Sequence, residues 1–273
     1  EASGVEARGR ITPDDLGIYL DEHISKLKQI AEFLSSFGAV PGIQIAHAGR
    51  KASTKNPWKV GNRHEKQDMS DSEGGWEIVG ASAIPFSPSS RVPRALEISE
   101  IKDIQEKFVD AAKRALAAGF KFLESHSAHG YLLHSFYSPL SNQRSDEYGG
   151  SFDNRVRFLL EVVEKVRKVW PDDLPLAVRI SGSDWVDDGW TIDDSVHLAK
   201  LLKDRGVDIV DCSSAFIRSG DRYPQGPGWQ LPIAEQVKRE AEIPTIAVGL
   251  ITEAAQANDI ICSGKADMVM LAR

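Results

Sequence analysis

The feature that most constrains this fold is a repeated alternation of amphipathic segments with short apolar runs. Apolar residues recur at three- and four-residue spacing in six segments, 22–37, 101–116, 156–169, 196–203, 233–241 and 254–262, a pattern that predicts helices. Three of the junctions to the next apolar run carry a glycine, Gly119, Gly206 and Gly264, as a helix end that turns back requires. The alternation predicts an α/β fold with a parallel sheet buried on both faces.

Polar, chemically capable side chains follow the predicted strands at their carboxyl ends. This asymmetry is typical of a (β/α)₈ TIM barrel, whose active site lies at that end. We expect one barrel domain over residues 1–273, with about six of the eight strand–helix units present and the first six residues forming the end of a further strand. The residues at the carboxyl ends are Gln44, His47, His126, His129, Arg179, Asp211, Gly249 and Arg273.

A long segment without helical period, residues 51–97, interrupts this alternation. Loops of this length in compact domains are usually functional, and we expect a lid or hairpin insertion over the barrel mouth.

Composition narrows the functional class. The chain has 33 Lys and Arg against 40 Asp and Glu, a formal charge of -7, which does not favour nucleic-acid binding. It has no apolar run of the roughly 18 residues that span a bilayer, so we expect a cytoplasmic protein. Cys212 and Cys262 lie in apolar segments and are expected to be two buried, reduced thiols.

The segment "ESHSAHGYLLHSFYSPLSNQRSDEYGG", residues 124–150, holds the strongest candidate site. A His-x-x-His pair without a third ligand is a weak metal signal, so no metal is predicted, and a structural pair remains open. Alternatively, His126 and His129 could donate to one carbonyl oxygen as negative charge grows on it, with Tyr131 as a proton donor. Arg179 could hold an anionic ring nitrogen or form an ordinary ion pair, and Gln44 offers a bidentate amide.

Four motifs, "IQIAHAGRK", "HSAHGYLLHSFYSPLSNQRSDEYGGSFDNRVRF", "VRIS" and "AVGLI", resemble the Old Yellow Enzyme family of FMN-dependent ene-reductases. The second histidine of His-x-x-His and the "HAGRK" context resemble its thermophilic-like (YqjM-type) branch. The resemblance implies an NADPH- or NADH-dependent enzyme that reduces the activated C=C bond of α,β-unsaturated carbonyl compounds by ping-pong hydride transfer through flavin N5. It also implies a homo-oligomer.

The same resemblance implies a role for each site residue. His126 and His129 would hold the carbonyl of an enone or enal, and Tyr131 would donate the proton. Gln44 and Arg179 would contact the flavin ring. The FMN phosphate would be bound by Gly249, Ala272 and Arg273.

The chain departs from the family pattern at both ends, where the first flavin-binding strands and the last segment are not found. Three alternatives remain: a 2,4-dienoyl-CoA reductase-like flavoenzyme, which shares the "GYLLHSF" and "NQRSDEYGG" patterns, a barrel fragment without activity, and a metal-dependent hydrolase, which would need carboxylate ligands near the histidine pair. In the polar run 141–155 we expect structural ties between a loop and the next helix, made by Arg144, Asp146, Asn154 and Arg155.

Overall fold

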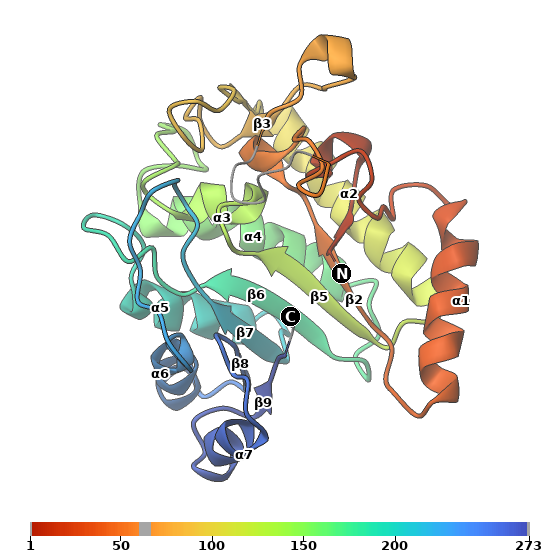
Figure 1. Cartoon of the computed structure of the whole chain (residues 1–273), viewed down its shortest axis with the longest axis vertical. Coiled ribbons are helices and arrows are strands. Elements are labelled where there is room, and N and C mark those ends of the chain that lie inside the picture. The colour runs from red at the N-terminus through yellow and green to blue at the C-terminus, as the bar shows by residue number, and fades with distance from the viewer. Residues whose placement is uncertain (1, 60–66, 272–273) are drawn as a thin grey trace.

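The computed structural model describes residues 2–59 and 67–271. Its centre is a seven-stranded sheet in which every neighbouring pair is parallel, with the helices outside it (Figure 1). This confirms the predicted α/β class and the parallel sheet. The strands, in sheet order, are β1 (Ala2–Gly4), β2 (Gly42–Ala46), β5 (Phe122–Ser127), β6 (Leu176–Ser181), β7 (Ile209–Ser213), β8 (Thr245–Ala247) and β9 (Met268–Val269).

In the described part of the chain, six of the seven α-helices follow the apolar periodicity of the sequence. In α2, residues Ile101, Ile104, Phe108 and Ala115 lie on one face and are fully buried. The junction glycines Gly119, Gly206 and Gly264 all have positive φ, as predicted. The helices are α1 (His23–Ser36), α2 (Ile98–Ala117), α3 (Leu132–Tyr137), α4 (Phe152–Arg167), α5 (Ile192–Lys203), α6 (Leu231–Ala241) and α7 (Ala254–Cys262).

The long segment 51–97 contains a small second sheet. Its strands β3 (Val79–Gly80) and β4 (Arg94–Ala95) pair in parallel, so these two strands do not form the expected hairpin. Residues 60–66 of the segment lie outside the described residues. A function of this segment as a lid stays a prediction.

One prediction about the cysteines was wrong. Cys212 is buried on β7, but Cys262 is exposed, and both thiols are free. The apolar pattern misled because α7 buries only Ile260, so the face of the helix that carries Cys262 remains in solvent. Within residues 2–59 and 67–271, no helix is both long and apolar enough to cross a membrane.

Candidate functional site

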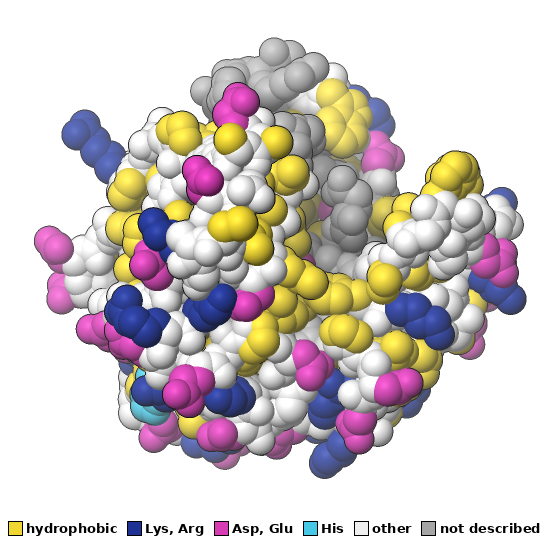
Figure 2. Space-filling view, turned by 90° about the horizontal axis from the view of Figure 1, so that it is seen from below, with side chains coloured by type: hydrophobic (Ala, Val, Ile, Leu, Met, Phe, Trp, Pro, Cys, Tyr) yellow, Lys and Arg dark blue, Asp and Glu magenta, His cyan; other side chains and the backbone are white. Residues whose placement is uncertain are grey.

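The predicted catalytic and flavin-ring residues line one cavity of about 620 Å³. Its walls come from β1, β2, β5 and β6, from Met270 after β9, and from the turn after β5. His126, His129, Tyr131, Gln44 and Arg179 all contribute to it. A space-filling view from below shows apolar side chains along the edge of a hollow in the molecule (Figure 2). The structure therefore brings together five of the eight residues that the sequence singled out.

The two histidines and the tyrosine form a compact aromatic group. The ring of His126 lies 5.1 Å from that of His129 and 5.1 Å from that of Tyr131, centroid to centroid, and both pairs are perpendicular. His126 is on β5, whereas His129 and Tyr131 belong to the turn that leads into α3. The end of one strand thus carries the whole group.

Burial keeps both imidazoles neutral. It lowers the pKa of His126 to about 3, with the positive charges of Arg179 and Lys51 acting in the same direction. Burial also holds the pKa of His129 well below its ordinary value, and the positive charges of Arg179 and Lys51 again act in the same direction. Neutral imidazoles donate one N–H each, so each ring can serve as a hydrogen-bond donor over the whole neutral pH range.

The surroundings of His126 identify its tautomer. The backbone N–H of Ala128 donates to His126 Nδ1 at 3.1 Å, so the ring proton is on Nε2. The Nε2 atom of His129 lies 2.6 Å from Ser213 Oγ. If the serine donates to Nε2, His129 presents its N–H through Nδ1. The sequence reasoning did not identify Ser213, which the pairing of β6 with β7 brings to this place.

Tyr131 is a neutral phenol with a cation nearby. Burial raises the pKa of Tyr131 to about 12, so the hydroxyl keeps its proton at neutral pH. The Lys51 ammonium group lies 5.0 Å from the centre of the Tyr131 ring and donates to the backbone carbonyl of His129 at 2.7 Å. Lys51 belongs to the "HAGRK" motif, but no role was assigned to it from the sequence.

Gln44 and Arg179 lie in a buried polar layer between the strands. Gln44 Nε2 donates to Glu124 Oε1, and Arg179 Nε lies 3.1 Å from Asp211 Oδ2. Burial raises the pKa of Glu124. Burial and the Glu124 charge together raise the pKa of Asp211 well above its ordinary value. These directions favour protonation of one of the two carboxyl groups.

Glu124 is an addition to the predicted site, and Asp211, which the sequence placed at a strand end, had no predicted role. The alternation of strand side chains places Glu124 on the same face of β5 as His126, and this signal was available in the sequence. The ion pair of Arg179 with Asp211 depends on their being directly opposite in the β6–β7 register. The sequence pattern does not give that register.

Of the three predicted phosphate-binding residues, Gly249 alone lies in the part of the chain that the structure describes. Gly249 follows β8 with a φ of 108°, but it does not line the 620 Å³ cavity. Ala272 and Arg273 lie outside the described residues, so these three assignments stay predictions. Among the described residues, no group of three or more His, Cys, Asp or Glu side chains could hold a metal ion.

The polar run 141–155 makes the structural ties that we expected. Arg144 donates to the backbone carbonyls of Ala81 and Leu96 at 3.0 and 2.7 Å and also binds Asp146. Arg155 donates to the Tyr137 carbonyl at 2.9 Å. These contacts hold the loop against the start of α4 and against residues 81–96, and none of these residues lines the cavity.

Comparisons with known proteins show what the chain is similar to in sequence and in fold. Residues 1–273 match the family described as NADH:flavin oxidoreductase / NADH oxidase. The chain is 46% identical over 273 residues to the NADPH dehydrogenase of Geobacillus sp. (strain WCH70) and 43% identical to that of Bacillus subtilis (strain 168), and covers 74% of each. A solved structure of morphinone reductase in complex with tetrahydroNAD superimposes with a TM-score of 0.79 at 26% identity, over 100% of this chain and 72% of that one. The TIM-barrel class predicted from the sequence is confirmed by this likeness.

Proposed function

Because the chain belongs to the NADH:flavin oxidoreductase / NADH oxidase family, that of the Old Yellow Enzymes, we propose that it reduces the activated C=C bond of α,β-unsaturated carbonyl compounds. Family membership makes the chain an NAD(P)H-dependent flavin oxidoreductase with FMN as its cofactor. The ene-reduction and its substrate class, an enone or enal, are the proposal. Assembly as a homo-oligomer stays a prediction.

The polar layer of the cavity fits a flavin ring. Its volume of about 620 Å³ is within the range of roughly 300–1,000 Å³ typical of cofactor sites. Gln44 and Arg179 line the cavity, so the Gln44 amide offers both a donor and an acceptor to a ligand, and the Arg179 guanidinium offers N–H donors besides its Nε, which faces Asp211 at 3.1 Å. The pyrimidine edge of a flavin carries both kinds of partner, and Gln44 and Arg179 would hold it there.

One observation carries the proposal: two neutral imidazoles and a neutral phenol line the same cavity as Gln44 and Arg179. When FMN is bound, it supplies a hydride at N5 that it has received from NAD(P)H. The residues must then stabilise the carbonyl oxygen of the substrate and deliver a proton to the adjacent carbon.

The residues present can do both. His126 donates from Nε2, and His129 can offer a second N–H to the same oxygen, so both stabilise the negative charge that develops on it. Tyr131 keeps its proton at neutral pH because burial raises its pKa to about 12, so it can act as a general acid. We assign the carbonyl contact to the histidines and protonation of the α-carbon to the tyrosine.

An absorption spectrum tests the cofactor and the reductant first. The purified protein with added FMN should retain flavin absorption after gel filtration, and NADPH added without oxygen should bleach it. Subsequent addition of 2-cyclohexenone should restore the oxidised spectrum. A bleached flavin that 2-cyclohexenone does not reoxidise would contradict the ene-reductase proposal while leaving the flavin oxidoreductase in place.

Variants then test the residues. His126→Ala and His129→Ala should each lower kcat/KM for 2-cyclohexenone by roughly 100-fold or more, as does the loss of one donor to a developing oxyanion. His197 is exposed on α5, so His197→Ala is the matched control and should change kcat/KM less than about twofold. Equal activity in all three variants would show that the histidine pair does not contact the substrate.

A further inference from the structure

The turn that carries His129 has an unusual backbone. His129 and Gly130 both have left-handed φ values, 58° and 71°, and for a histidine this conformation is uncommon and unfavourable. Such a conformation persists only where its surroundings enforce it. The turn is therefore held by contacts, and those contacts determine where the His129 ring lies.

Two side chains hold the backbone N–H groups of this turn. The N–H of His129 donates to Ser181 Oγ at 2.8 Å, and the N–H of Gly130 donates to His134 Nδ1 at 2.7 Å. Ser181 ends β6, and His134 lies in α3. The loop after β7 lies close by, since Ser181 Oγ also donates to the Ala215 carbonyl at 3.2 Å.

We propose that His134 and Asp184 are positioning residues, which together fix the His129–Gly130 turn and so determine the position of the His129 imidazole. The inference rests on the proposed function for its consequence in catalysis. Neither residue lines the cavity, so neither contacts the substrate. The pair acts only through the backbone next to His129.

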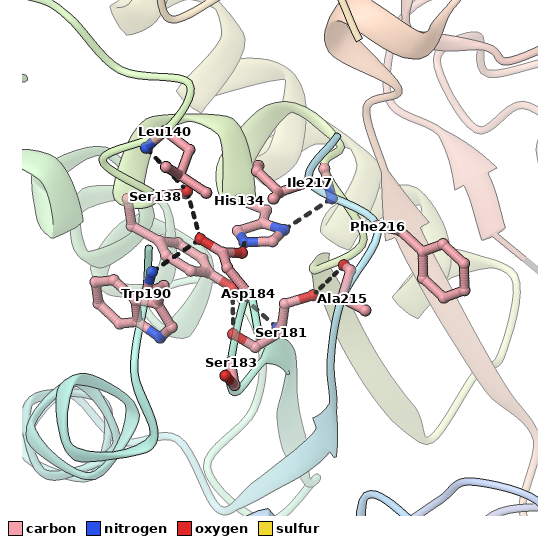
Figure 3. Close-up of polar contacts among 12 residues, drawn as sticks. His134, Ser138, Leu140, Ser181, Ser183, Asp184, Trp190, Ala215, Phe216 and Ile217 are labelled. Carbon is pink, nitrogen blue, oxygen red and sulfur yellow. Dashed lines mark hydrogen bonds and ion pairs between the residues drawn. The ribbon is translucent and has the colours of Figure 1, made fainter. Parts of the chain in front are cut away.

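The contacts of Asp184 fix the tautomer of His134. Asp184 Oδ1 accepts from His134 Nε2 at 3.0 Å, and both side chains are completely buried. Asp184 Oδ2 accepts from Ser138 Oγ at 2.7 Å and from the backbone N–H of Trp190 at 2.9 Å. Figure 3 shows Asp184 with its partners His134, Ser138 and Trp190 around it. Because Nε2 carries the proton, Nδ1 is left as the acceptor that the Gly130 N–H needs.

Burial supports this arrangement. It lowers the pKa of His134, so the ring is neutral and Nδ1 keeps its lone pair. Although burial opposes ionisation of Asp184, its contacts with His134 and Ser138 hold the pKa of this carboxyl below its ordinary value. The carboxylate is thus an acceptor on both of its oxygens.

The Asp184→Asn variant tests this relay, the chain of contacts from Asp184 through His134 to the Gly130 N–H, with almost no change in side-chain volume. An asparagine has one acceptor oxygen, and the Trp190 N–H, a backbone group, competes for it. With the oxygen toward Trp190, the amide NH₂ faces His134 and forces its proton onto Nδ1. That proton would then oppose the Gly130 N–H, and the turn would lose its anchor.

We expect Asp184→Asn to lower kcat/KM for 2-cyclohexenone by about 10- to 100-fold, the usual effect of misplacing a catalytic group. The affinity for FMN should change less than about twofold, because Gln44 and Arg179 are untouched. Ser138→Ala is the control: it removes one donor to Asp184 but leaves the His134 tautomer unchanged. It should retain kcat/KM within about threefold.

Rescue separates positioning from simple packing. Asparagine at 134 places an oxygen where Nδ1 stands, so the double variant Asp184→Asn with His134→Asn should regain most of the activity lost in Asp184→Asn alone. His134→Phe, which keeps bulk but lacks the acceptor, should remain impaired. If the double variant and His134→Phe lose the same amount of kcat/KM, the proposal is overturned.

Nitrogen-15 NMR of the histidine rings gives a readout independent of activity. In Asp184→Asn, the His134 signals should switch tautomer and the His129 signals should move, whereas in Ser138→Ala both should stay. Unmoved His129 signals alongside a switched His134 would refute the relay, even if the protein reduces no enone. If Asp184→Asn does not fold, two single variants test the same contact with Gly130: His134→Phe, which lacks the acceptor, must shift the His129 signals, and His134→Asn, which keeps an acceptor, must shift them less.

Discussion

The substitution Gly130→Ala probes how tightly the catalytic turn is packed. A Cβ at residue 130 would lie 2.4 Å from the carbonyl oxygen of Phe216 and 3.2 Å from Ile217 Cα, both backbone atoms. Cβ atoms essentially never approach a neighbour within 3.0 Å, so the turn and the loop after β7 must separate by at least the 0.6 Å difference. Such a shift displaces His129, the neighbouring residue.

Two costs add in this variant, and a matched control separates them. The positive φ of 71° at Gly130 costs an alanine about 1 kcal/mol, and the overlap adds about 1–3 kcal/mol. Gly150 has a similar φ of 80°, but nothing lies within 4 Å of its Cβ position. Gly150→Ala should therefore show only the first cost, about 1 kcal/mol.

Urea unfolding and steady-state kinetics measure the two effects. Gly130→Ala should lose about 2–4 kcal/mol of unfolding free energy and about 10- to 100-fold in kcat/KM for 2-cyclohexenone. Gly150→Ala should keep its activity. If the two variants lose equal stability and Gly130→Ala keeps full activity, the turn is not packed as described, and the argument for a fixed His129 fails.

Three further predictions concern other parts of the structure. The stability of Asp211→Asn relative to the parent should increase as pH rises above about 4. Burial and the Glu124 charge raise the pKa of Asp211 in the folded state, whereas the unfolded side chain ionises near pH 4, so only the parent loses stability as pH rises. Urea unfolding from about pH 5 to 8 measures this difference in unfolding free energy, and a difference that falls with pH contradicts the prediction. Tyr131→Phe should slow flavin reoxidation by 2-cyclohexenone by about 100-fold or more but leave NADPH bleaching unchanged, as stopped-flow absorbance would show. Arg144→Ala should destabilise the protein by about 2–4 kcal/mol, since it leaves two backbone carbonyls without a donor, whereas the exposed Arg239→Ala should change thermal stability little.

Periodicity predicted the large elements because burial of one face determines them. α2 and α4 follow their apolar residues closely, and so do the buried strands β5 and β6. The periodicity failed where elements are short. α3 has six residues and β3 and β4 have two each, too few for a helical or strand period to stand out.

The candidate site was predictable as far as it depends on strand ends. His126 and Arg179 end neighbouring parallel strands, so both had to point to the same region, and they are opposite each other in the β5–β6 register. Contacts that depend on turn geometry were not predictable. The bond from Gly130 to His134 requires two left-handed residues in succession; glycine allows this conformation at residue 130, but a histidine at residue 129 does not specify it.

The electrostatics of the site follow from a single arrangement of buried charges. Burial lowers the pKa of His126 most, and the charges of Arg179 and Lys51 lower it further. The ring is therefore a neutral donor and not a cation. The same two cations favour negative charge near them, and Arg179 itself lines the cavity. In the proposed reaction, negative charge grows on the substrate oxygen between the histidines. Lys51 and Arg179, which help to keep the imidazoles neutral, therefore also stabilise the oxygen to which the imidazoles donate. A cationic His126 would stabilise that oxygen more strongly, but burial and two neighbouring cations make protonation of His126 unfavourable at neutral pH. The site instead combines neutral donors with fixed positive charges.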